Sequence, residues 1–275
     1  MRKGKRPSLP YAGPARIIIF TGAGTSAEAG IPTFRYNLDG RPAFWNEVDP
    51  LAVCDITTFR QNRADSCDFH NKFRTLVGQS QPTSFHHAVK TWQQECTEKG
   101  MELIVITQNV DDLFERAGVD NIVHVHGEIR YMQCLAYKHQ WFVGYDHQMI
   151  DTACKLGCGC KVCKPGVVFF NERAPAYEAT LKLLESLGTK DTLIVLGTSC
   201  KVFPLETVLE NGRVRKIYSG LDFPASLSPD LFDRVILGPC TEVLGRVEWQ
   251  RKIRLMQIEG PDLAPYVQVA HKLNK

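Results

Sequence analysis

Several residues with side chains suited to chemistry follow short apolar runs. Gln108, Asn109 and Asp111 come directly after one such run, and His126 comes after the next. Imidazole titrates near neutral pH, so His126 is the natural candidate for a base at pH 7. A lone histidine is more often a core residue, but the neighbouring amides and carboxylate favour catalysis. His124, two residues before His126, is predicted to be structural.

A second group of residues forms a glycine turn. The apolar residues 17–20 break into Thr-Gly-Ala-Gly-Thr-Ser-Ala at 21–27, which predicts a strand, a tight turn and the start of a helix. Gly22 and Gly24 let the backbone approach a ligand closely, and the first N–H groups of a helix suit a pyrophosphate. The spacing fits a dinucleotide-binding turn. Alone, the same pattern is equally typical of a turn that uses glycine for packing.

The cysteines form a third group. Five of the ten lie within residues 134–163, and the others are scattered. Such crowding is typical of metal binding in a reducing compartment rather than of a secreted disulfide framework.

Length and composition describe an ordinary globular chain. It has 275 residues, 44% of them hydrophobic and 23% charged, and a net charge of +3. This charge is too small to indicate nucleic-acid binding, and no apolar run approaches the ~18 residues of a membrane span. We therefore expect an intracellular, cytoplasmic protein. The basic cluster near the N-terminus predicts a flexible tail over residues 1–14.

The elements that must position these groups alternate along the chain. Short apolar runs predict strands at 17–20, 103–106, 122–125, 167–170, 193–196, 214–218 and 234–237. Helical spacing predicts helices at 63–77, 82–99, 111–116, 175–187 and 241–253, with a structured loop at 36–49. This alternation predicts an α/β fold with a doubly wound parallel sheet, whose ligands lie beyond the carboxyl ends of the strands. Residues 128–164 show little periodicity and predict an inserted metal-held lobe.

Taken together, the motifs resemble the sirtuins, the NAD-dependent protein lysine deacylases. The resemblance lies in the run from Gly22 to Arg35 and in further matches that keep sirtuin order. These are Thr107-Gln108-Asn109-Val110-Asp111, His124-Val125-His126-Gly127, Pro165 to Glu172, Gly197-Thr198-Ser199 and Gly238-Pro239-Cys240. The family fold is Rossmann-like, with a small zinc-binding lobe and a helical subdomain. This implies one catalytic domain at 15–275, with small-domain insertions at about 36–80 and 128–171.

The resemblance also implies a reaction. In sirtuins a lysine acyl oxygen attacks C1′ of the nicotinamide ribose, nicotinamide leaves, and a histidine then takes a proton from the ribose. His126 matches that histidine, and Asn109 matches the residue that orients the ribose and a water. Asp111 matches the acceptor for the nicotinamide carboxamide. Capping of the following helix is an alternative role for Asp111, compatible with binding.

Two sets of ligand contacts follow from the family. The residues expected to bind NAD are Gly22, Ala23, Gly24, Ser26, Phe34, Arg35, Gln108, Asn109, Asp111, Gly197, Thr198, Ser199, Ser219 and Cys240. The residues expected to bind an acyl-lysine protein or peptide are His70, Phe73, Val167, Phe170 and Asn171. Three positions depart from the usual pattern: Thr33 replaces an aspartate, Asn171 a glycine and Ser219 an asparagine.

A structural zinc ion is the second expected cofactor. Family members supply two Cys-x-x-Cys pairs, but only Cys160 and Cys163 form a clear pair here. Cys134 matches the first ligand, and Tyr137 stands where its partner should be. The predicted ligands are Cys134, Cys158, Cys160 and Cys163, with Cys154 and His139 as alternatives for the fourth. A lobe that has lost its metal is the competing interpretation.

The sequence gives conflicting indications of which acyl group is removed. Thr33 resembles the desuccinylase branch, which recognises a carboxylate with a Tyr-x-x-Arg pair, but His70 and Phe73 occupy those two positions. A succinyl carboxylate would lose its guanidinium partner. Acetyl or a longer apolar acyl group is therefore predicted. A shift of one residue would bring Arg74 into the pocket, and a purely core role for Phe73 stays open.

Other activities of the scaffold stay open at this point. An ADP-ribosyltransferase or NAD hydrolase, a desuccinylase or demalonylase, and a non-catalytic NAD-sensing module are the alternatives. The presence of Asn109, Asp111 and His126 counts against a sensor, which would not need a base. The sequence does not fix the oligomeric state.

Overall fold

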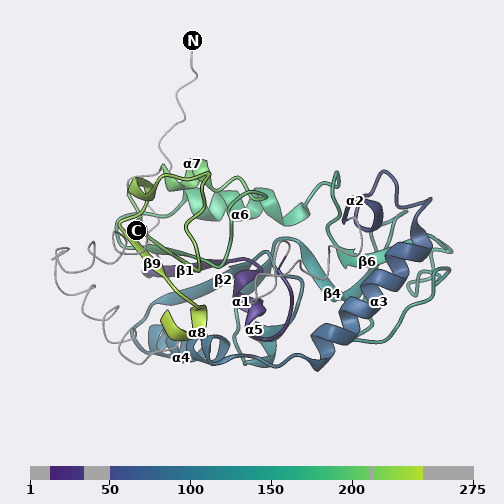
Figure 1. Cartoon of the computed structure of the whole chain (residues 1–275), viewed down its shortest axis with the longest axis horizontal. Coiled ribbons are helices and arrows are strands. Elements are labelled where there is room, and N and C mark those ends of the chain that lie inside the picture. The colour runs from purple at the N-terminus through teal and green to yellow at the C-terminus, as the bar shows by residue number, and fades with distance from the viewer. Residues whose placement is uncertain (1–12, 34–49, 211–212, 244–275) are drawn as a thin grey trace, which may run out of the picture.

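The computed structural model describes residues 13–33, 50–210 and 213–243. The molecule is elongated, with a large sheet toward one end and a smaller sheet beside helix α3 (Arg63–Gln79) at the other (Figure 1). The two parts meet where the chain leaves β3 (Ile122–His124) and enters β4 (Gly127–Cys134).

The large sheet has six parallel strands in the order β3-β2-β1-β7-β8-β9. Besides β3, its strands are β1 (Arg16–Thr21), β2 (Glu102–Thr107), β7 (Thr192–Leu196), β8 (Arg215–Gly220) and β9 (Arg234–Leu237). The order reverses between β1 and β7, which is the point where ligands bind in sheets of this kind. The α/β doubly wound fold predicted from the sequence is confirmed.

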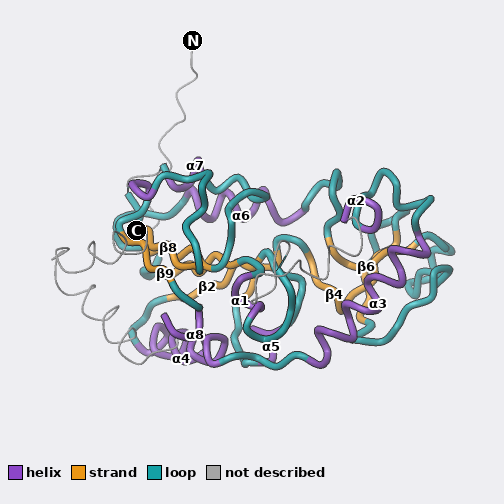
Figure 2. Tube along the Cα trace, viewed as in Figure 1, coloured by secondary structure: helices purple, strands orange, loops and turns teal. Residues whose placement is uncertain are grey.

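The central strands are apolar on both faces because helices cover both faces. The run Ile17-Ile18-Ile19 alternates between two buried clusters. One cluster includes Leu184 of α6 (Pro175–Glu185) and Val208 of α7 (Glu206–Leu209), and the other includes Val89 of α4 (Ser84–Glu98). Figure 2 shows the strands between these two layers of helices. Continuous burial of this kind is typical of parallel sheets.

The helices differ widely in length. They are α1 (Gly24–Ala27), α2 (Pro50–Val53), α3 (Arg63–Gln79), α4 (Ser84–Glu98), α5 (Leu113–Arg116), α6 (Pro175–Glu185), α7 (Glu206–Leu209) and α8 (Cys240–Val243), with a 3-10 turn at Pro229–Leu231. Thr83 caps α4 in a capping box completed by His86. The helix expected at 111–116 is shorter and begins at Leu113.

The smaller part of the molecule has its own sheet and core. Strand β4 pairs antiparallel with β5 (Gln140–Phe142) and β6 (Cys163–Val167). Phe69 and Phe73 of α3 pack against Ile129 and Phe169 in one hydrophobic cluster. The segments that meet here are those predicted to form the insertions, whose limits stay a prediction. The strand expected at 167–170 instead ends at Val167, and Phe170 makes an isolated bridge to Asp55.

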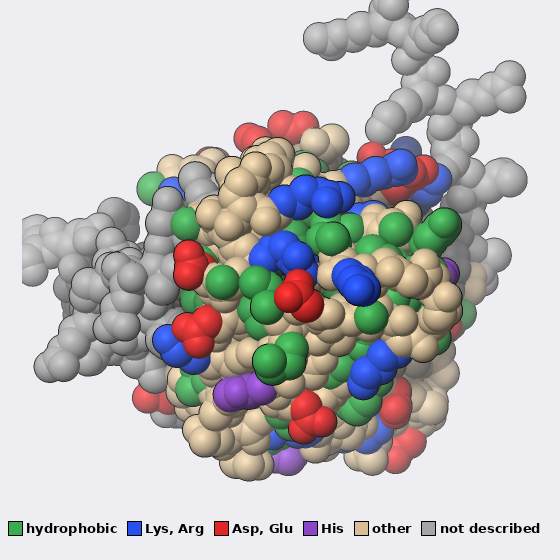
Figure 3. Space-filling model, turned by 90° about the vertical axis from the view of Figure 1, so that its right-hand side faces the viewer, with side chains coloured by type: hydrophobic (Ala, Val, Ile, Leu, Met, Phe, Trp, Pro, Cys, Tyr) green, Lys and Arg blue, Asp and Glu red, His purple; other side chains and the backbone are tan. Residues whose placement is uncertain are grey.

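The outer end of the small part carries apolar and charged side chains side by side (Figure 3). Its exposed apolar residues include Tyr137, Phe142, Met149 and Leu156. Because they are interspersed with groups of both signs, this view shows no extended patch of one kind.

Some predicted segments lie outside the described residues. These are the basic tail up to residue 12, the loop at 36–49 and the part of the last helix beyond Val243. Within the described part of the chain, no helix combines the length and apolar character needed to cross a bilayer.

Candidate functional site

The glycine turn is held by close contact with a second loop. A Cβ atom on Gly22 would lie 2.7 Å from the Thr198 Cβ, and one on Gly24 would lie 2.8 Å from the Gly197 Cα. Gly197 itself has a φ of +54°, and a Cβ atom on it would meet the backbone of Gly24 and Thr25. The glycines therefore allow two strand-end loops to meet. Helix α1 is a single turn, shorter than the glycine turn suggested.

A chain of hydrogen bonds joins three of the predicted NAD-binding residues. The Asn109 amide donates to the Ser26 hydroxyl at 2.8 Å and to the Thr25 hydroxyl at 3.1 Å. The Ser26 hydroxyl donates to the Asp111 carboxylate, also at 2.8 Å. Asp111 is 5% exposed and also accepts from the Leu113 backbone N–H at 3.2 Å. Asp111 therefore supports the start of α5 while its carboxylate is tied to the glycine-turn segment.

Burial affects the protonation of Asp111. Removal from water raises the pKa of its carboxyl, while the hydrogen bonds from Ser26 and Leu113 act in the opposite direction. Raising the pKa favours retention of a proton, and the protonated form can donate as well as accept. Such a group can match either the oxygen or the nitrogen of a carboxamide.

Gln108 connects this network to the loop after β7. Its side-chain amide donates to the Thr198 hydroxyl at 2.9 Å and to the Thr21 carbonyl at 3.2 Å. Thr198 is buried, and Ser199 follows it. Gln108, Asn109 and the loops at 21–26 and 197–199 thus lie together at the carboxyl ends of β1, β2 and β7.

Buried polar atoms at this edge provide a test of whether a cofactor fits. The hydroxyl oxygens of Thr21 and Ser219 are buried and have no hydrogen-bond partner among the described residues. Both lie at or near the carboxyl ends of their strands. Together with the Asn109 and Asp111 side chains, this donor and acceptor set fits the sugar and carboxamide groups of NAD.

Among the predicted NAD-binding residues, Cys240 has its side chain in the core. Cys240 is 4% exposed and its side chain packs in the hydrophobic cluster beneath the sheet, where burial raises the pKa of its thiol to about 12. Its thiol is therefore directed into the core, and the backbone is what remains to meet a ligand. Phe34 and Arg35 lie outside the described residues.

His126 lies at the junction of the two sheets. Its backbone carbonyl accepts from the Val168 N–H at 2.8 Å, and its Nδ1 donates to the Gln108 carbonyl at 2.9 Å. Because a carbonyl only accepts, Nδ1 carries the proton and Nε2 holds the lone pair. Burial lowers the pKa of His126, and the Gln108 carbonyl acts in the opposite direction. The neutral ring is the form that can act as a base.

His124 has different partners. Its Nδ1 donates to the Asn109 carbonyl at 3.1 Å and its Nε2 to the Glu115 carboxylate at 2.6 Å. Burial alone would lower its pKa, but the hydrogen bond and charge of Glu115 outweigh burial and raise it. Arg130 lies 3.8 Å from the same carboxylate. His124 is thus part of an ion-pair cluster beside the site, in keeping with a structural role.

The segment predicted to bind the substrate runs from β6 to the start of α6. Phe170 is partly exposed, whereas Val167 is buried in β6. Asn171 has a φ of 59°, in the left-handed region that asparagine tolerates better than most residues, and its amide donates to Asp55 at 2.7 Å. Asn171 therefore adopts the left-handed backbone conformation that a glycine, the usual residue at this position, would adopt readily.

The residues at the predicted acyl positions are buried. His70 is 3% exposed, its Nδ1 donates to the Ser66 carbonyl at 2.7 Å, and its Nε2 faces the Cys54 thiol at 3.7 Å. Burial lowers the pKa of His70 to about 3, so its ring stays neutral. Phe73 stacks with Phe69 in the core of the small part. Neither ring offers a charge to a carboxylate.

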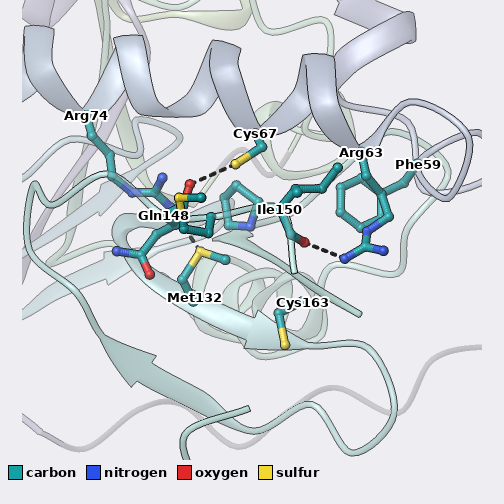
Figure 4. A pocket seen from close by; sticks show the side chains of 10 residues that line it. Phe59, Arg63, Cys67, Arg74, Met132, Gln148, Ile150 and Cys163 are labelled. Carbon is teal, nitrogen blue, oxygen red and sulfur yellow. Dashed lines mark hydrogen bonds between the residues drawn. The ribbon is translucent and has the colours of Figure 1, made fainter. Parts of the chain in front are cut away.

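Arg74 points elsewhere. Its guanidinium donates to the Ile129 carbonyl at 3.0 Å and to the Asn71 amide oxygen at 3.0 Å. Figure 4 shows it at one end of a cavity between α3 and the metal lobe, with Arg63 at the other end. This cavity is lined by Phe59, Arg63, Cys67, Arg74, Met132, Gln148, Met149, Ile150, Cys163 and Pro165. The one-residue shift considered from the sequence would require Arg74 to leave these partners.

The metal lobe brings together a ligand set that differs from the predicted one. The ligand atoms of Cys134, His139, Cys154 and Cys158 all lie within 4.8 Å of one another. The Cys134 and Cys158 sulfurs are 3.8 Å apart. A tetrahedral zinc with bonds of about 2.3 Å has sulfur–sulfur edges of about 3.8 Å. The group fits a structural zinc of the Cys₃His type.

Cys160 and Cys163 are therefore a correction to the predicted set. The Cys160 thiol donates to the Val162 carbonyl at 3.3 Å, and Cys163 begins strand β6 opposite Cys134. Neither residue belongs to the converging group, although the Cys163 thiol still lies 3.7 Å from the Cys160 carbonyl. His139 and Cys154, the alternatives for one position, both belong to the group. Along the chain the group is a Cys-x₄-His pair followed by a Cys-x₃-Cys pair. Neither pair has the Cys-x-x-Cys spacing expected from the sequence.

Comparison with known proteins agrees with this geometry. Residues 22–204 match the family model described as Sir2 family. The chain belongs to the Sir2 family. An NAD-dependent protein deacylase of Helicobacter hepaticus is 32% identical over 250 residues, covering 85% of this chain and 96% of the relative. One from Campylobacter jejuni strain RM1221 is 38% identical over 189 residues, covering 69% and 76%.

Solved structures of Sir2 homologues have the same fold. One in complex with NAD superimposes with a TM-score of 0.70 at 28% identity, covering 88% of this chain and 90% of that chain. A mutant homologue in complex with ADP-ribose gives a TM-score of 0.72 at 28% identity and covers 90% and 95%. Family membership, predicted from ordered motifs, is confirmed.

Tyr177 is a residue that the sequence did not single out. It lies in the first turn of α6, and its hydroxyl is 2.7 Å from Nε2 of His126. A tyrosine in a helix carries no motif, so only the three-dimensional structure brings it to the site.

Proposed function

We propose that this Sir2-family chain is an NAD-dependent protein lysine deacylase that releases nicotinamide and 2′-O-acyl-ADP-ribose. The observation that carries the proposal is the state of His126. Its ring is neutral and fixed in one tautomer by Gln108, and it lies beside the hydrogen-bonded set of Asn109, Ser26 and Asp111. The deacylase relatives support the same activity.

Each polar side chain has a task in this proposal. NAD, when bound, supplies an activated ribose carbon with nicotinamide as the leaving group. Asp111 holds the carboxamide, and Asn109, fixed through Thr25 and Ser26, orients the ribose and a water. Gln108 holds the ribose from the side of Thr198. His126 takes the proton of a ribose hydroxyl, a role worth about 10²–10⁴ in rate.

The zinc ion has a structural role. Three of its ligands, Cys134, Cys154 and Cys158, lie in a cluster with Met132, Trp141 and Val143. Zinc bound by four protein ligands leaves no position for substrate. The ion therefore holds the lobe and takes no part in the reaction.

We infer that the preferred acyl group is acetyl or a longer apolar chain. Phe73 is apolar, and His70 is neutral with its one N–H given to Ser66. Arg74 is tied to Ile129 and Asn71. A succinyl carboxylate at these positions would lack a cationic partner, which costs about 1.4 kcal/mol or more and lowers kcat/KM at least tenfold.

The test is product analysis by mass spectrometry. The protein is incubated with NAD and acetyl-, decanoyl- and succinyl-lysine versions of one peptide. Deacylated peptide with acyl-ADP-ribose supports the proposal, and the succinyl peptide should be the poorest substrate. ADP-ribosylated peptide or free ADP-ribose alone would identify a transferase or an NAD hydrolase. Unchanged NAD would identify a sensing module.

The cellular location and the binding partner of the protein are further parts of this proposal. The crowded cysteines, arranged as a metal site with no disulfide among the described residues, favour a reducing, cytoplasmic location. An acyl-lysine protein or peptide is the proposed partner. The net charge of +3 gives no support for nucleic acid as a ligand.

A further inference from the structure

The lone pair of His126 is already engaged in the cofactor-free protein. Nδ1 carries the proton because it donates to the Gln108 carbonyl at 2.9 Å. Nε2 is then a pure acceptor with a single lone pair in the plane of the ring. The Tyr177 hydroxyl lies 2.7 Å from Nε2, so it donates along that lone pair. A ribose hydroxyl that must lose its proton to His126 finds this position occupied.

Tyr177 is held in place from behind. Its ring meets Phe203 edge-on, with centroids 4.9 Å apart, and Phe203 in turn packs on Phe20 of β1 at 5.1 Å. Phe203 and Phe20 are both fully buried. The hydroxyl is therefore fixed relative to the central strand of the sheet. Displacing it from His126 would require a shift of α6 or of this aromatic stack.

The hydroxyl keeps its proton at neutral pH. Burial raises the pKa of Tyr177 above its usual 10.0. A neutral phenol has one O–H to donate and lone pairs that accept. Tyr177 can therefore accept from one hydroxyl while it donates to Nε2.

We propose that Tyr177 relays the proton from the ribose hydroxyl to His126. The proposal rests on the deacylase function proposed above. The ribose O–H bond breaks and its proton joins the Tyr177 oxygen, while the proton that Tyr177 carried joins Nε2 of His126. Tyr177 is neutral before and after the step. The ribose oxygen keeps the electron pair of the broken O–H bond, and the positive charge resides on the imidazolium, which still donates from Nδ1 to the Gln108 carbonyl.

The first test separates two steps of one reaction with the variant Tyr177→Phe. Exchange of labelled nicotinamide into NAD in the presence of acetyl-lysine peptide reports the step before the base acts. Formation of acyl-ADP-ribose reports the step that needs it. We expect exchange to persist and product formation to fall about 10²-fold.

A matched control is Tyr145→Phe. Tyr145 also gives its hydroxyl to a buried partner, Asp112 at 2.5 Å, but lies away from His126. The ratio of product formation to exchange should equal that of the unmodified protein. For Tyr177→Phe, an unchanged ratio or faster product formation overturns the relay. It would mean that the ribose hydroxyl reaches Nε2 directly. Equal loss of both reactions with a lower Tm would also overturn it.

The second test needs neither NAD nor peptide. In cofactor-free protein labelled with ¹⁵N-histidine, the Nε2 resonance of His126 reports the hydrogen bond that it accepts. Tyr177→Phe should shift this resonance and leave Nδ1 protonated, whereas an unchanged resonance overturns the contact. This result holds even if the protein removes no acyl group, so failure of the function and failure of the relay are distinguishable.

Discussion

The edge of the large sheet and the metal lobe both hold polar side chains in a fixed arrangement, but they do so by different means. At the sheet edge, the side chains of Gln108, Asn109 and Asp111 are fixed by hydrogen bonds to neighbouring strand-end loops. In the lobe, three thiols and the imidazole of His139 converge on one point. A parallel sheet brings its strand ends together by backbone pairing, whereas in the lobe three of the four ligands, His139, Cys154 and Cys158, lie outside the described strands.

This difference indicates what each region depends on. The site geometry at the sheet edge is built by the protein chain and should survive the loss of one side chain. The lobe geometry depends on a metal ion that satisfies all four ligands, since binding a structural zinc contributes about 10–16 kcal/mol. Variants in the two regions should therefore fail in different ways.

The largest effect is expected in the lobe. Cys154→Ser removes a ligand, and we expect zinc content to fall from one equivalent to below half, with unfolding of residues 134–163. Cys160→Ser is the matched control, because its thiol donates to a backbone carbonyl instead. Elemental analysis of protein purified without chelator gives the metal content. If Cys160→Ser loses zinc as fully as Cys154→Ser, the Cys₃His assignment is incorrect.

At the sheet edge, His126→Ala should remove activity and spare the fold. We expect acyl-ADP-ribose formation to fall about 10²–10⁴-fold, while the backbone bond from Val168 to the carbonyl of residue 126 is kept. Tm and NAD binding, measured by calorimetry, should stay close to those of the unmodified protein. Near-normal turnover would exclude His126 from the mechanism. A large fall in Tm would instead indicate a core histidine.

The glycine turn offers a sharper probe of how the sheet edge is assembled. In Gly24→Ala the new Cβ would lie 2.8 Å from the Gly197 backbone, so the two loops must separate. NAD binding should weaken about tenfold or more, an effect of about 1.4 kcal/mol. Gly188→Ala is the control, because nothing lies within 4 Å of its Cβ position. Equal NAD affinity of the two variants would show that the loop contact is dispensable.

The smallest effect concerns His124 and pH. Its raised pKa means that its contribution to stability is complete below the unfolded value near 6.5 and declines as pH rises through the folded value. Glu115 has a lowered pKa: burial would raise it, but the hydrogen bond and charge of His124 outweigh burial. Its contribution to stability is complete above the unfolded value near 4.5 and is lost as pH falls through the folded value. Asp111, Glu128 and Arg130 also face this pair.

We therefore expect His124→Gln to lower Tm most between pH 4.5 and 6.5 and progressively less toward pH 9. For a chain of this size, each kcal/mol corresponds to about 2–4 °C. Thermal unfolding monitored by circular dichroism at several pH values measures the difference. A difference in Tm that grows with rising pH would contradict the assigned charge of His124.

Sequence patterns predicted the large sheet well because its central strands are uninterrupted apolar runs. Ile17 to Phe20 and Leu193 to Leu196 are apolar throughout and are buried on both faces. The polar motifs follow directly after them, so strand order places them together. Family membership followed from the same motifs.

The ligands of the lobe were harder to predict because they depend on the path of the chain between them. Cys160 and Cys163 have zinc-like spacing, yet the ligand atoms that converge belong to Cys134, His139, Cys154 and Cys158. Tyr177 carried no signal, because its role depends on an approach of residues 51 positions apart. Local spacing does not encode such long-range contacts.

The order of strands in the large sheet also constrains how the chain folds. β1 pairs with β7, although about 170 residues separate them, and the glycine turn rests on Gly197 and Thr198. Closing so long a loop is slow, and pairing cannot begin before both strands exist. During synthesis from the N-terminus, the edge of β1 that pairs with β7 stays unpaired until β7 has been made. A nascent chain cut before residue 192 would expose this edge and should depend on chaperones.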